Sequence, residues 1–286
     1  MKKILLFCFS VFLLTLSNAQ NSRFFYEYNF KLDSLHRDSI KTEMMVLEIS
    51  PKGSHFVSHK KVVYDSTLTA SFKNSQNTGQ THFDFTHLRP AVVNFQVTKN
   101  YPDYKTSVYL PISSELFKLE YSKALPWKIL QEKSTIEGIK VQKATVDAMG
   151  RSWIAWFAEE IQIQDGPYRF SGLPGLILKL EDSNGDHIFV FKGNRKLKEE
   201  SSLTNSNLFR HSIAVTDDKF NQQWQAYKKD PAKNLRAKGG SGSTVVVSAS
   251  FDGKSLNSND IMKQIEKEAK EEIAKNNNPI DLSLYK

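Results

Sequence analysis

Histidine side chains are the residues of this chain that could bind a transition metal, and their spacing gives two groups to consider. His82 and His87 stand on either side of Asp84 in a polar, irregular stretch, so these three side chains could converge on one ion. His55 and His59 lie four residues apart in a segment with strand character. On a strand they would be about 13 Å apart, at ~3.3 Å per residue, which is too far for one zinc ion. Ordinary core or surface histidines are the simpler interpretation, so no metal site is predicted and the loop with His82 and His87 is left open.

The acidic loop from Asp182 to Asp186 is a candidate for calcium binding, because it places oxygen side chains at alternate positions. An EF-hand loop requires glycine at its sixth position and glutamate at its twelfth. Here Gly185 stands at the fourth position and Gly193 at the twelfth. Asn184-Gly185 is instead a strong signal for a two-residue hairpin turn, since type I′ turns need positive φ twice. We predict a hairpin turn, and a weak calcium contact at its tip is left open.

Nucleophilic catalysis has no support in the sequence. No Gly-x-Ser-x-Gly motif is present, and serines and carboxylates are scattered without the pattern of a catalytic triad. Glu159, Glu160 and Asp165 lie close together in sequence, but a catalytic pair of carboxylates needs environments that separate the two pKa values. A solvated strand end explains these three residues more simply. We predict no catalytic residues and no cofactor.

A glycine- and proline-rich loop precedes an apolar strand, and five residues punctuate it: Gly166, Pro167, Gly172, Pro174 and Gly175. Phosphate-binding loops place a helix N-terminus and usually a lysine after their glycines. Here a strand follows, and Arg169 is the only nearby cation. Glycine provides positive φ or close approach of the backbone, and proline fixes φ, so two such turns specify one backbone path. We predict that the loop is structural and places Tyr168 and Leu173 in the core.

The most suggestive apolar group lies on one strand, at Trp153, Trp156 and Phe157. These side chains put large apolar surface on both faces of the strand. A strand that is apolar on both faces is usually buried between a sheet and its cover. Alternatively, one of the faces lines a cavity for an apolar ligand. We therefore name Trp153, Trp156 and Phe157 as the hypothetical ligand-binding residues.

Short strands separated by turn signals must position these groups. Alternating or apolar runs predict strands over residues 24–32, 43–49, 54–64, 91–97, 106–110, 127–131, 138–147, 151–157, 176–180, 187–191 and 244–250. Few helices intervene, so the chain is predicted to be an α+β protein with a mostly antiparallel, large curved sheet or half-barrel. A short helix is predicted over 65–73, followed by a polar loop over 74–79.

Two further helices are expected to cover this sheet. The first follows Thr216, a good N-cap, and contains Phe220, Trp224 and Tyr227 at spacings that place them on one face. The second runs from about residue 260 to 275, with a narrow apolar stripe among charged residues. In the strand after the glycine-rich loop, Leu176, Leu178 and Leu180 are predicted to share one face, opposite Ile177, Lys179 and Glu181.

Residues 1–19 have the parts of a signal peptide. Lys2 and Lys3 precede an apolar stretch that is too short to span a bilayer, and Ser17-Asn18-Ala19 provides small residues before a cleavage site. We predict cleavage near Ala19, which leaves residues 20–286 as a single domain in the periplasm or secreted, with no transmembrane segment. Cys8 is the one cysteine of the chain, so cleavage would leave no disulfide and no thiolate ligand.

The chain carries a formal net charge of +8. A basic balance is typical of nucleic-acid binding, but export makes that partner improbable, and we predict none. Anionic lipid head groups or an acidic partner suit the charge better. Solubility is the simplest explanation, because no block of like charges stands out.

The hexapeptide from Gly172 to Ile177, with the sequence Gly-Leu-Pro-Gly-Leu-Ile, resembles the signature of the GLPGLI family of exported proteins from Bacteroidetes-type bacteria. The resemblance is strongest over about residues 127–182, where it includes the strand 151–157 and the segment Asp165-Gly166-Pro167. That family has no established activity. The resemblance therefore implies export and a signature of structural residues, Gly166, Pro167, Gly172, Leu173, Pro174, Gly175, Leu176 and Ile177, but no particular chemistry.

Three functions remain open at this point. The first is a non-enzymatic periplasmic binding or carrier protein that serves the outer membrane, with an architecture similar to the LolA-type lipoprotein carriers. The second is an accessory or structural subunit of an envelope complex, with an outer-membrane protein as partner. The third is a hydrolase with an unrecognised site. A deep apolar cavity would favour the first, an exposed apolar patch the second, and a polar cleft with paired titratable groups the third.

Overall fold

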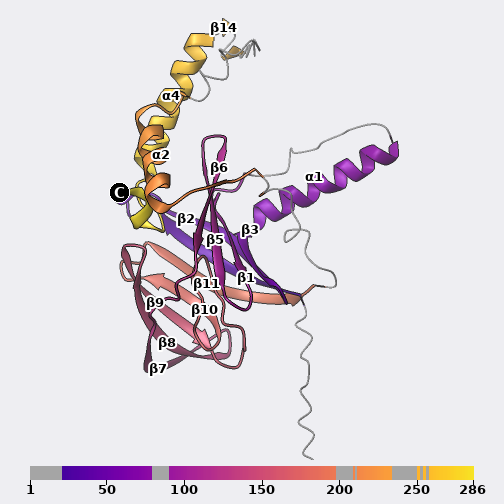
Figure 1. The fold of residues 1–286 in the computed structure, drawn as a ribbon, viewed down its shortest axis with the longest axis vertical. Coiled ribbons are helices and arrows are strands. Elements are labelled where there is room, and N and C mark those ends of the chain that lie inside the picture. Colours follow the sequence, from indigo (N-terminus) through magenta and orange to yellow (C-terminus); the bar gives the residue numbers. More distant parts are fainter. Residues whose placement is uncertain are drawn as a thin grey trace, which may run out of the picture.

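The computed structural model describes residues 21–78, 90–197, 209, 211–233, 250–251, 254–255 and 258–286. Its main feature is one large, curved, mostly antiparallel sheet, with helices at its periphery (Figure 1). Its strands are β1 (Ser22–Lys31), β2 (Ile40–Ser50), β3 (Gly53–Ser58), β4 (Gln96–Asn100), β5 (Lys105–Ile112), β6 (Glu115–Tyr121), β7 (Lys128–Ile136), β8 (Ile139–Ala148), β9 (Arg151–Ala158), β10 (Leu176–Asp182), β11 (His187–Lys196) and β12 (Ile213–Ala214). A separate short ribbon consists of β13 (Ser250–Phe251) and β14 (Lys254–Ser255).

The 12-stranded sheet has the order β12-β6-β5-β4-β3-β2-β1-β11-β10-β9-β8-β7. Within β2–β6 and within β7–β11, consecutive strands are neighbours in the sheet. Most of these pairs are joined by short turns, but a long connection with α1 lies between β3 and β4, and the glycine-rich loop lies between β9 and β10. β1 itself pairs with β2 on one edge and with β11 on the other. The first strand of the chain therefore joins the half formed by β2–β6 to the half formed by β7–β11.

Helices lie on two sides of this sheet (Figure 1). α1 (His59–Thr78) leaves the end of β3 and projects away, whereas α2 (Asp217–Lys229) and α4 (Ser258–Lys275) lie together on the opposite side, near a 3₁₀-helix η2 (Leu282–Tyr285). Thr216 caps α2 through its side chain, as predicted, and Phe220 is buried. Among the described residues, no helix is both long and apolar enough to cross a membrane.

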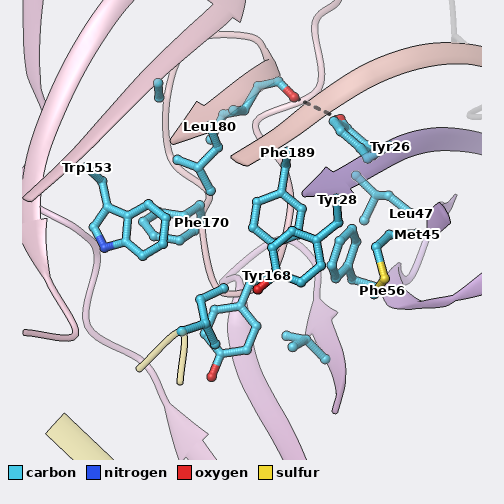
Figure 2. Packing of buried hydrophobic residues seen from close by; sticks show 14 of the residues in the cluster. Tyr26, Tyr28, Met45, Leu47, Phe56, Trp153, Tyr168, Phe170, Leu180 and Phe189 are labelled. Atoms are coloured by element: carbon cyan, nitrogen blue, oxygen red, sulfur yellow. Dashed lines mark hydrogen bonds between the residues drawn. The ribbon is translucent and has the colours of Figure 1, made fainter. Parts of the chain in front are cut away.

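The core follows directly from alternation along β1. Phe24, Tyr26, Tyr28 and Phe30 point to one face of the sheet and are buried, whereas the residues between them are less so, with the exception of Arg23 beside them. Tyr28 stacks on Phe189 of β11 with ring centroids 4.0 Å apart. Figure 2 shows these two rings at the centre of the core, between Trp153 and Phe170 on one side and Met45, Leu47 and Phe56 on the other.

The structure contains the hairpin turns that were predicted from the sequence. In the turn between β10 and β11, Gly185 has a φ of +64° but Asn184 does not have positive φ, so this hairpin closes without the type I′ geometry expected for Asn184-Gly185. Glu137-Gly138 and Met149-Gly150 have positive φ at both residues, which is the geometry of a type I′ turn. The sheet of hairpins predicted from these dipeptides is therefore confirmed at β7–β8, β8–β9 and β10–β11.

Several predicted boundaries are wrong. The strand expected over 54–64 ends at Ser58, and α1 contains both the helix predicted over 65–73 and residues 74–78 of the loop predicted over 74–79. Val62 of α1 packs against Val57 of β3, a tertiary contact that local β-propensity does not reveal. The strand expected over 91–97 is β4 at Gln96–Asn100, and β6 was not predicted. Residues 244–249 lie outside the described part of the chain.

The strand after the glycine-rich loop also departs from simple alternation. The pairing of β10 with β9 shifts register between Ile177 and Lys179. A shift of this kind brings consecutive residues to the same side. Leu176, Ile177 and Leu178 are all fully buried, so the predicted division of this strand into a leucine face and an opposite face does not separate buried from exposed side chains here.

Candidate functional site

A cavity of about 630 Å³ lies between the sheet and the C-terminal elements. The end of β1, the turn between β5 and β6, the segment before β4, helices α2 and α4 and the chain after α4 all contribute to its wall. Most of the wall residues are apolar or aromatic, among them Phe30, Phe95, Ile112, Trp224, Tyr227 and Tyr285, although polar and apolar atoms share the wall surface about equally. Its volume lies within the ~300–1,000 Å³ of small-molecule sites.

Two buried polar atoms in the wall have no hydrogen-bond partner in the structure, Oη of Tyr168 and Nε2 of His187. The two residues are only 1% and 2% exposed. Burial, with a smaller contribution from the Asp281 carboxylate, raises the pKa of Tyr168 well above its ordinary value, so its hydroxyl keeps its proton. Because an unsatisfied buried polar atom is unfavourable by roughly 1–3 kcal/mol, these two atoms are the points at which a ligand could add hydrogen bonds.

The His187 ring is held in place from its other side. Its Nδ1 is hydrogen-bonded to Oη of Tyr28 at 2.7 Å, and the two rings stack. Burial, followed by the nearby Arg151 guanidinium, lowers the pKa of His187 to about 3, so the imidazole is neutral near pH 7. The backbone of Asn278 and Pro279 lies close to the ring but forms no hydrogen bond of good geometry with Nε2, so this neutral imidazole can still donate or accept one hydrogen bond there.

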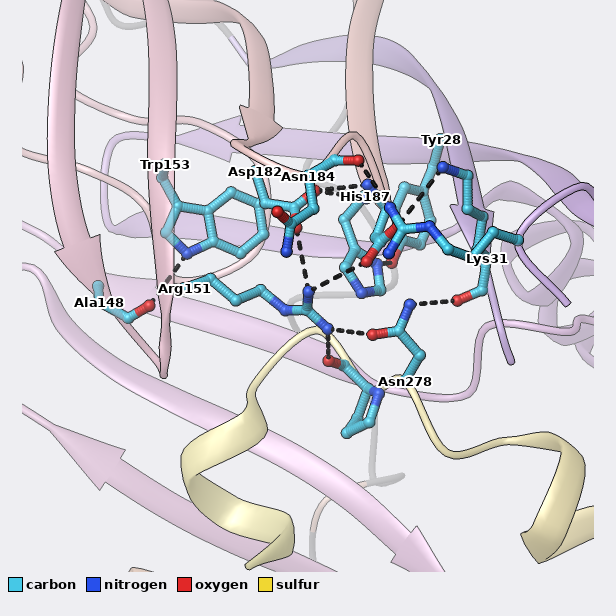
Figure 3. A network of polar contacts seen from close by, with 12 residues as sticks. Tyr28, Lys31, Ala148, Arg151, Trp153, Asp182, Asn184, His187 and Asn278 are labelled. Carbon is cyan, nitrogen blue, oxygen red and sulfur yellow. Dashed lines mark hydrogen bonds and ion pairs between the residues drawn. The ribbon is translucent and has the colours of Figure 1, made fainter. Parts of the chain in front are cut away.

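An arginine-centred network fixes the chain after α4, which closes one side of the cavity (Figure 3). The Arg151 guanidinium on β9 donates to Asp182 at 3.0 Å, and to the Asn278 side chain and the Pro279 carbonyl at 2.6 Å each. Asn278 in turn donates to the Lys31 carbonyl at 2.9 Å. The C-terminal segment is thus bound to both β9 and the end of β1.

The glycine-rich loop is fixed by a buried ion pair. Nζ of Lys99 donates to Asp165 at 2.5 Å and to the carbonyls of Gly166 and Phe170 at 2.8 and 3.1 Å. Ser54 and Tyr101 donate to the second oxygen of Asp165 at 2.6 and 2.5 Å. Both charged side chains are buried, at 1% and 0% exposed. This pair attaches the loop that carries Tyr168 to β3 and β4, so it positions one of the two unpartnered atoms of the cavity.

Tyr168 and Leu173 of this loop are buried in the core, as predicted. Tyr168 has a φ of +51°, which is unusual for a residue with a side chain. The interpretation of Glu159, Glu160 and Asp165 as a solvated strand end is right for the two exposed glutamates and wrong for Asp165, whose carboxylate Lys99 neutralises inside the protein.

The hypothetical ligand-binding residues of β9 do not line this cavity. Trp153 and Phe157 are buried in the core, and Nε1 of Trp153 donates to the Ala148 carbonyl at 3.0 Å. Trp156 is half-buried on the other face of the strand, with Nζ of Lys143 5.8 Å from its ring centroid. The cavity is instead lined by residues of β1, β5, α2 and α4, and the pattern of a single strand does not predict that these elements meet.

The residues considered for metal binding have other surroundings. His55 is on β3, whereas His59 is the first residue of α1, so the two do not share a strand. His82, Asp84 and His87 lie outside the described residues. Within the described residues no group of three or more His, Cys, Asp or Glu side chains has the geometry of a metal site.

The two aspartates of the hairpin loop are engaged by protein groups. Asp182 accepts hydrogen bonds from Arg151 and from the backbone N–H groups of Asp186 and His187. Asp186 forms ion pairs with Arg37 at 2.7 Å and with Lys31 at 3.4 Å. The loop is therefore a hairpin turn whose carboxylates serve the arginine network.

Sequence reasoning missed Tyr28 and His187 as wall residues and Lys99 as the partner of Asp165. Tyr28 and His187 come together because β1 pairs with β11, a contact between segments about 160 residues apart. One signal was available for Tyr168, because it lies in the glycine- and proline-rich loop and was expected in the core. That signal predicts burial but not the cavity beside it.

The fold and the cavity define a mostly antiparallel β protein with a partly open, ligand-sized space beneath its C-terminal helices. Residues 122–179, from the residues before β7 to β10, match the model of a Bacteroidetes-associated family described as "Protein of unknown function (Porph_ging)". The match includes the glycine-rich loop. No curated protein sequence matches the chain.

Solved structures of PNGF-II in two crystal forms, with space groups P21 and C2, are similar to part of the chain. The sequence identities are 15% and 16%, the TM-scores are 0.47 and 0.46, and each match covers 69% of this chain. They cover 32% and 31% of the PNGF-II chains, so this chain spans about a third of the length of those proteins.

Proposed function

We propose that the protein is a non-enzymatic binding or carrier protein that holds an apolar or amphipathic small molecule in the cavity beneath α2 and α4. One observation carries this proposal: a cavity of about 630 Å³ has an aromatic wall and two buried polar atoms without partners. Aromatic surface supplies affinity for an apolar body, and a few polar groups orient the ligand. The proposal moves the ligand from the face of Trp153, Trp156 and Phe157 to this neighbouring space.

We propose that the protein is located in the periplasm or outside the cell, after cleavage near Ala19, and that it is associated with the outer membrane. The charged start, the short apolar stretch and the small residues before Gln20 support it. We also propose membership of the GLPGLI family, since the hexapeptide lies within the matched residues 122–179, and a carrier architecture of the LolA type.

The expected affinity is moderate. Burial of some 300 Å² of apolar ligand surface supplies about 7 kcal/mol at ~25 cal/mol per Å², before the unfavourable entropy of association. A dissociation constant in the micromolar range or weaker follows, which suits a carrier that must also release its ligand.

A neutral fluorescent probe tests the proposal. We expect N-phenyl-1-naphthylamine to bind the purified protein with increased emission and a micromolar dissociation constant. Ala269→Phe fills the cavity from α4 and should raise that constant at least about tenfold. Ala274→Phe, on the exposed side of the same helix, is the matched control and should bind as the wild type does. Equal binding by both variants, or no binding by the wild type, would refute this site.

A further inference from the structure

The charges around the cavity narrow the class of ligand. Glu272 of α4 is the only Asp, Glu, Lys or Arg side chain among the described residues that line it. The one wall histidine, His187, is neutral near pH 7, because burial lowers its pKa to about 3. The wall therefore offers no positive charge to a carboxylate, sulfate or phosphate, and transfer of such a group into it would be strongly unfavourable.

The aromatic part of the wall lies close to this glutamate. Trp224 and Tyr227 are neighbours on α2 with ring centroids 5.9 Å apart, and Trp224 meets Tyr285 at 5.2 Å with the ring planes 87° apart. Burial and, secondly, the Glu272 carboxylate raise the pKa of Tyr227, so the carboxylate is close enough to act on that ring. Aromatic faces attract cations within about 6 Å of the ring centroid, and non-parallel rings can contact one cation from different sides.

Glu272 is also available for a ligand. Its carboxylate forms no ion pair or hydrogen bond with any residue that the structure describes, and its side chain is exposed to solvent. By contrast, Glu43 and Asp182 of the sheet and Asp165 of the glycine-rich loop each have a lysine or arginine partner. A carboxylate at the edge of an aromatic cluster, without such a partner, is suited to balance the charge of a bound cation.

The surface next to the cavity is acidic as well, although the chain as a whole carries a formal net charge of +8. A second, more open hollow shares Leu32, Glu272 and Asn276 with the cavity. Its ionisable wall residues are predominantly acidic and comprise Asp33, Asp38, Glu268, Glu271, Glu272, Lys41, Lys275 and His36, of which His36 pairs with Asp33 at 2.6 Å. Clustered charge of one sign raises the local concentration of ligands of the opposite sign.

We propose that the ligand of this cavity is an organic cation with an apolar body. Its ammonium group would lie against Trp224, Tyr227 and Tyr285 with Glu272 as counter-charge, and its apolar body would extend between Phe30 and Phe95 toward Tyr168 and His187. The inference rests on the proposed binding function and adds the sign of the ligand's charge. The unpartnered Oη of Tyr168 and Nε2 of His187 would bind an uncharged polar group at the far end of the body.

Three probes with the same benzyl body and different charge test this assignment by displacement of N-phenyl-1-naphthylamine. They are benzyltrimethylammonium, its neutral isostere neopentylbenzene, and phenylmethanesulfonate. The expected order of affinity is cation, neutral isostere, anion. We expect the cation to bind about fivefold or more tightly than the isostere, as cation–aromatic attraction of about 1–2 kcal/mol implies.

Two charge-removing variants of α4 locate the preference. Glu272→Gln should weaken benzyltrimethylammonium about fivefold and leave neopentylbenzene within twofold of the wild type. Glu271→Gln removes the same charge one residue away, on a side chain that does not line the cavity, and should change the affinity for the cation less than twofold. This comparison separates a local contact from the general field of the acidic surface.

The outcomes distinguish the two proposals. If the naphthylamine probe and neopentylbenzene bind and Ala269→Phe abolishes both, but the cation has no advantage or the sulfonate binds best, the binding function stands and the cationic ligand is refuted. An equal effect of Glu272→Gln and Glu271→Gln also refutes it. If none of the four compounds binds the wild-type protein, both proposals fail.

Discussion

His187 shows how one residue connects the core, the cavity and the pH dependence of the protein. Its ring is stacked on Tyr28, its Nδ1 is bonded to the Tyr28 hydroxyl, and its Nε2 has no partner. A sequence cannot assign these roles, because a histidine at the start of an apolar strand is equally compatible with the surface. The pairing of β1 with β11 brings His187 against Tyr28 in the core, and this pairing joins residues that are far apart in the chain.

This histidine makes the fold less stable in acid. The folded pKa is about 3 and the ordinary value is 6.5, so between these values the unfolded chain binds more protons than the native protein. The free energy of unfolding is therefore unaffected by this group above pH 6.5 and falls as the pH drops from 6.5 toward 3, by up to about 1.4 kcal/mol per pH unit.

Urea unfolding at pH 7 and pH 4.5 measures this effect. We expect the wild type to lose about 2–3 kcal/mol more between the two values than His187→Gln does. His211→Gln, at an exposed position, controls for the removal of an imidazole. An equal pH-dependent loss in the wild type and His187→Gln would show that His187 is accessible to protons in the folded state.

At the scale of elements, the glycine-rich loop between β9 and β10 illustrates how far sequence patterns reach. Its glycines and prolines predicted a fixed backbone path and buried Tyr168 and Leu173, and both residues are buried. Hairpins were predicted equally well at Glu137-Gly138 and Met149-Gly150, because the chemistry of those turns is local. The boundary of β3, the start of α1 and the partner of Asp165 depend on tertiary contacts and were not predicted.

Two glycines of this loop are needed for different reasons, and their variants should differ. A Cβ atom at Gly175 would lie 2.1 Å from the Ala158 carbonyl oxygen, so the end of β9 would have to move. A Cβ atom at Gly172 meets nothing within 4 Å, but φ is +90° there. We expect Gly172→Ala to lower the free energy of unfolding by about 1 kcal/mol through backbone strain, and Gly175→Ala to lower it by about 3 kcal/mol or more.

Gly138→Ala is the matched control for strain alone. Gly138 has a φ of +78° and open space around its Cα, so its variant should resemble Gly172→Ala in urea unfolding. A loss at Gly175 no greater than at Gly138 would mean that the loop can move away from β9. If both loop variants unfolded normally and only probe binding changed, the loop would be a binding element rather than a structural one.

At the scale of the whole molecule, the position of β1 determines whether the sheet is one cooperative unit. The first strand lies between β2 and β11, so each half of the sheet has its central edge covered by the same ten residues. Composition and turn signals predicted a large antiparallel sheet but not this order, because alternation in a strand does not identify its partner. The prediction of a single domain over residues 20–286 depends on the pairing of β1 with both β2 and β11.

A proline in β1 tests whether the pairing of β1 with β2 and β11 makes the two halves of the sheet unfold together. Glu27 pairs with Met44 of β2 and Val190 of β11, so Glu27→Pro disrupts the ladder at the centre of the sheet and should lower the free energy of unfolding by about 3 kcal/mol or more. Glu132→Pro, at the register shift of the edge strand β7, is the matched control and should lower it by about 1 kcal/mol or less.

The same variants test whether the sheet is one cooperative unit. Tryptophan fluorescence reports mainly on β9 and α2, and far-ultraviolet circular dichroism reports on the whole sheet. If the sheet unfolds as one unit, the two signals will give the same urea midpoint in both variants. Separate midpoints in Glu27→Pro would show that the β2–β6 and β7–β11 halves fold independently, and the single-domain prediction would then be wrong.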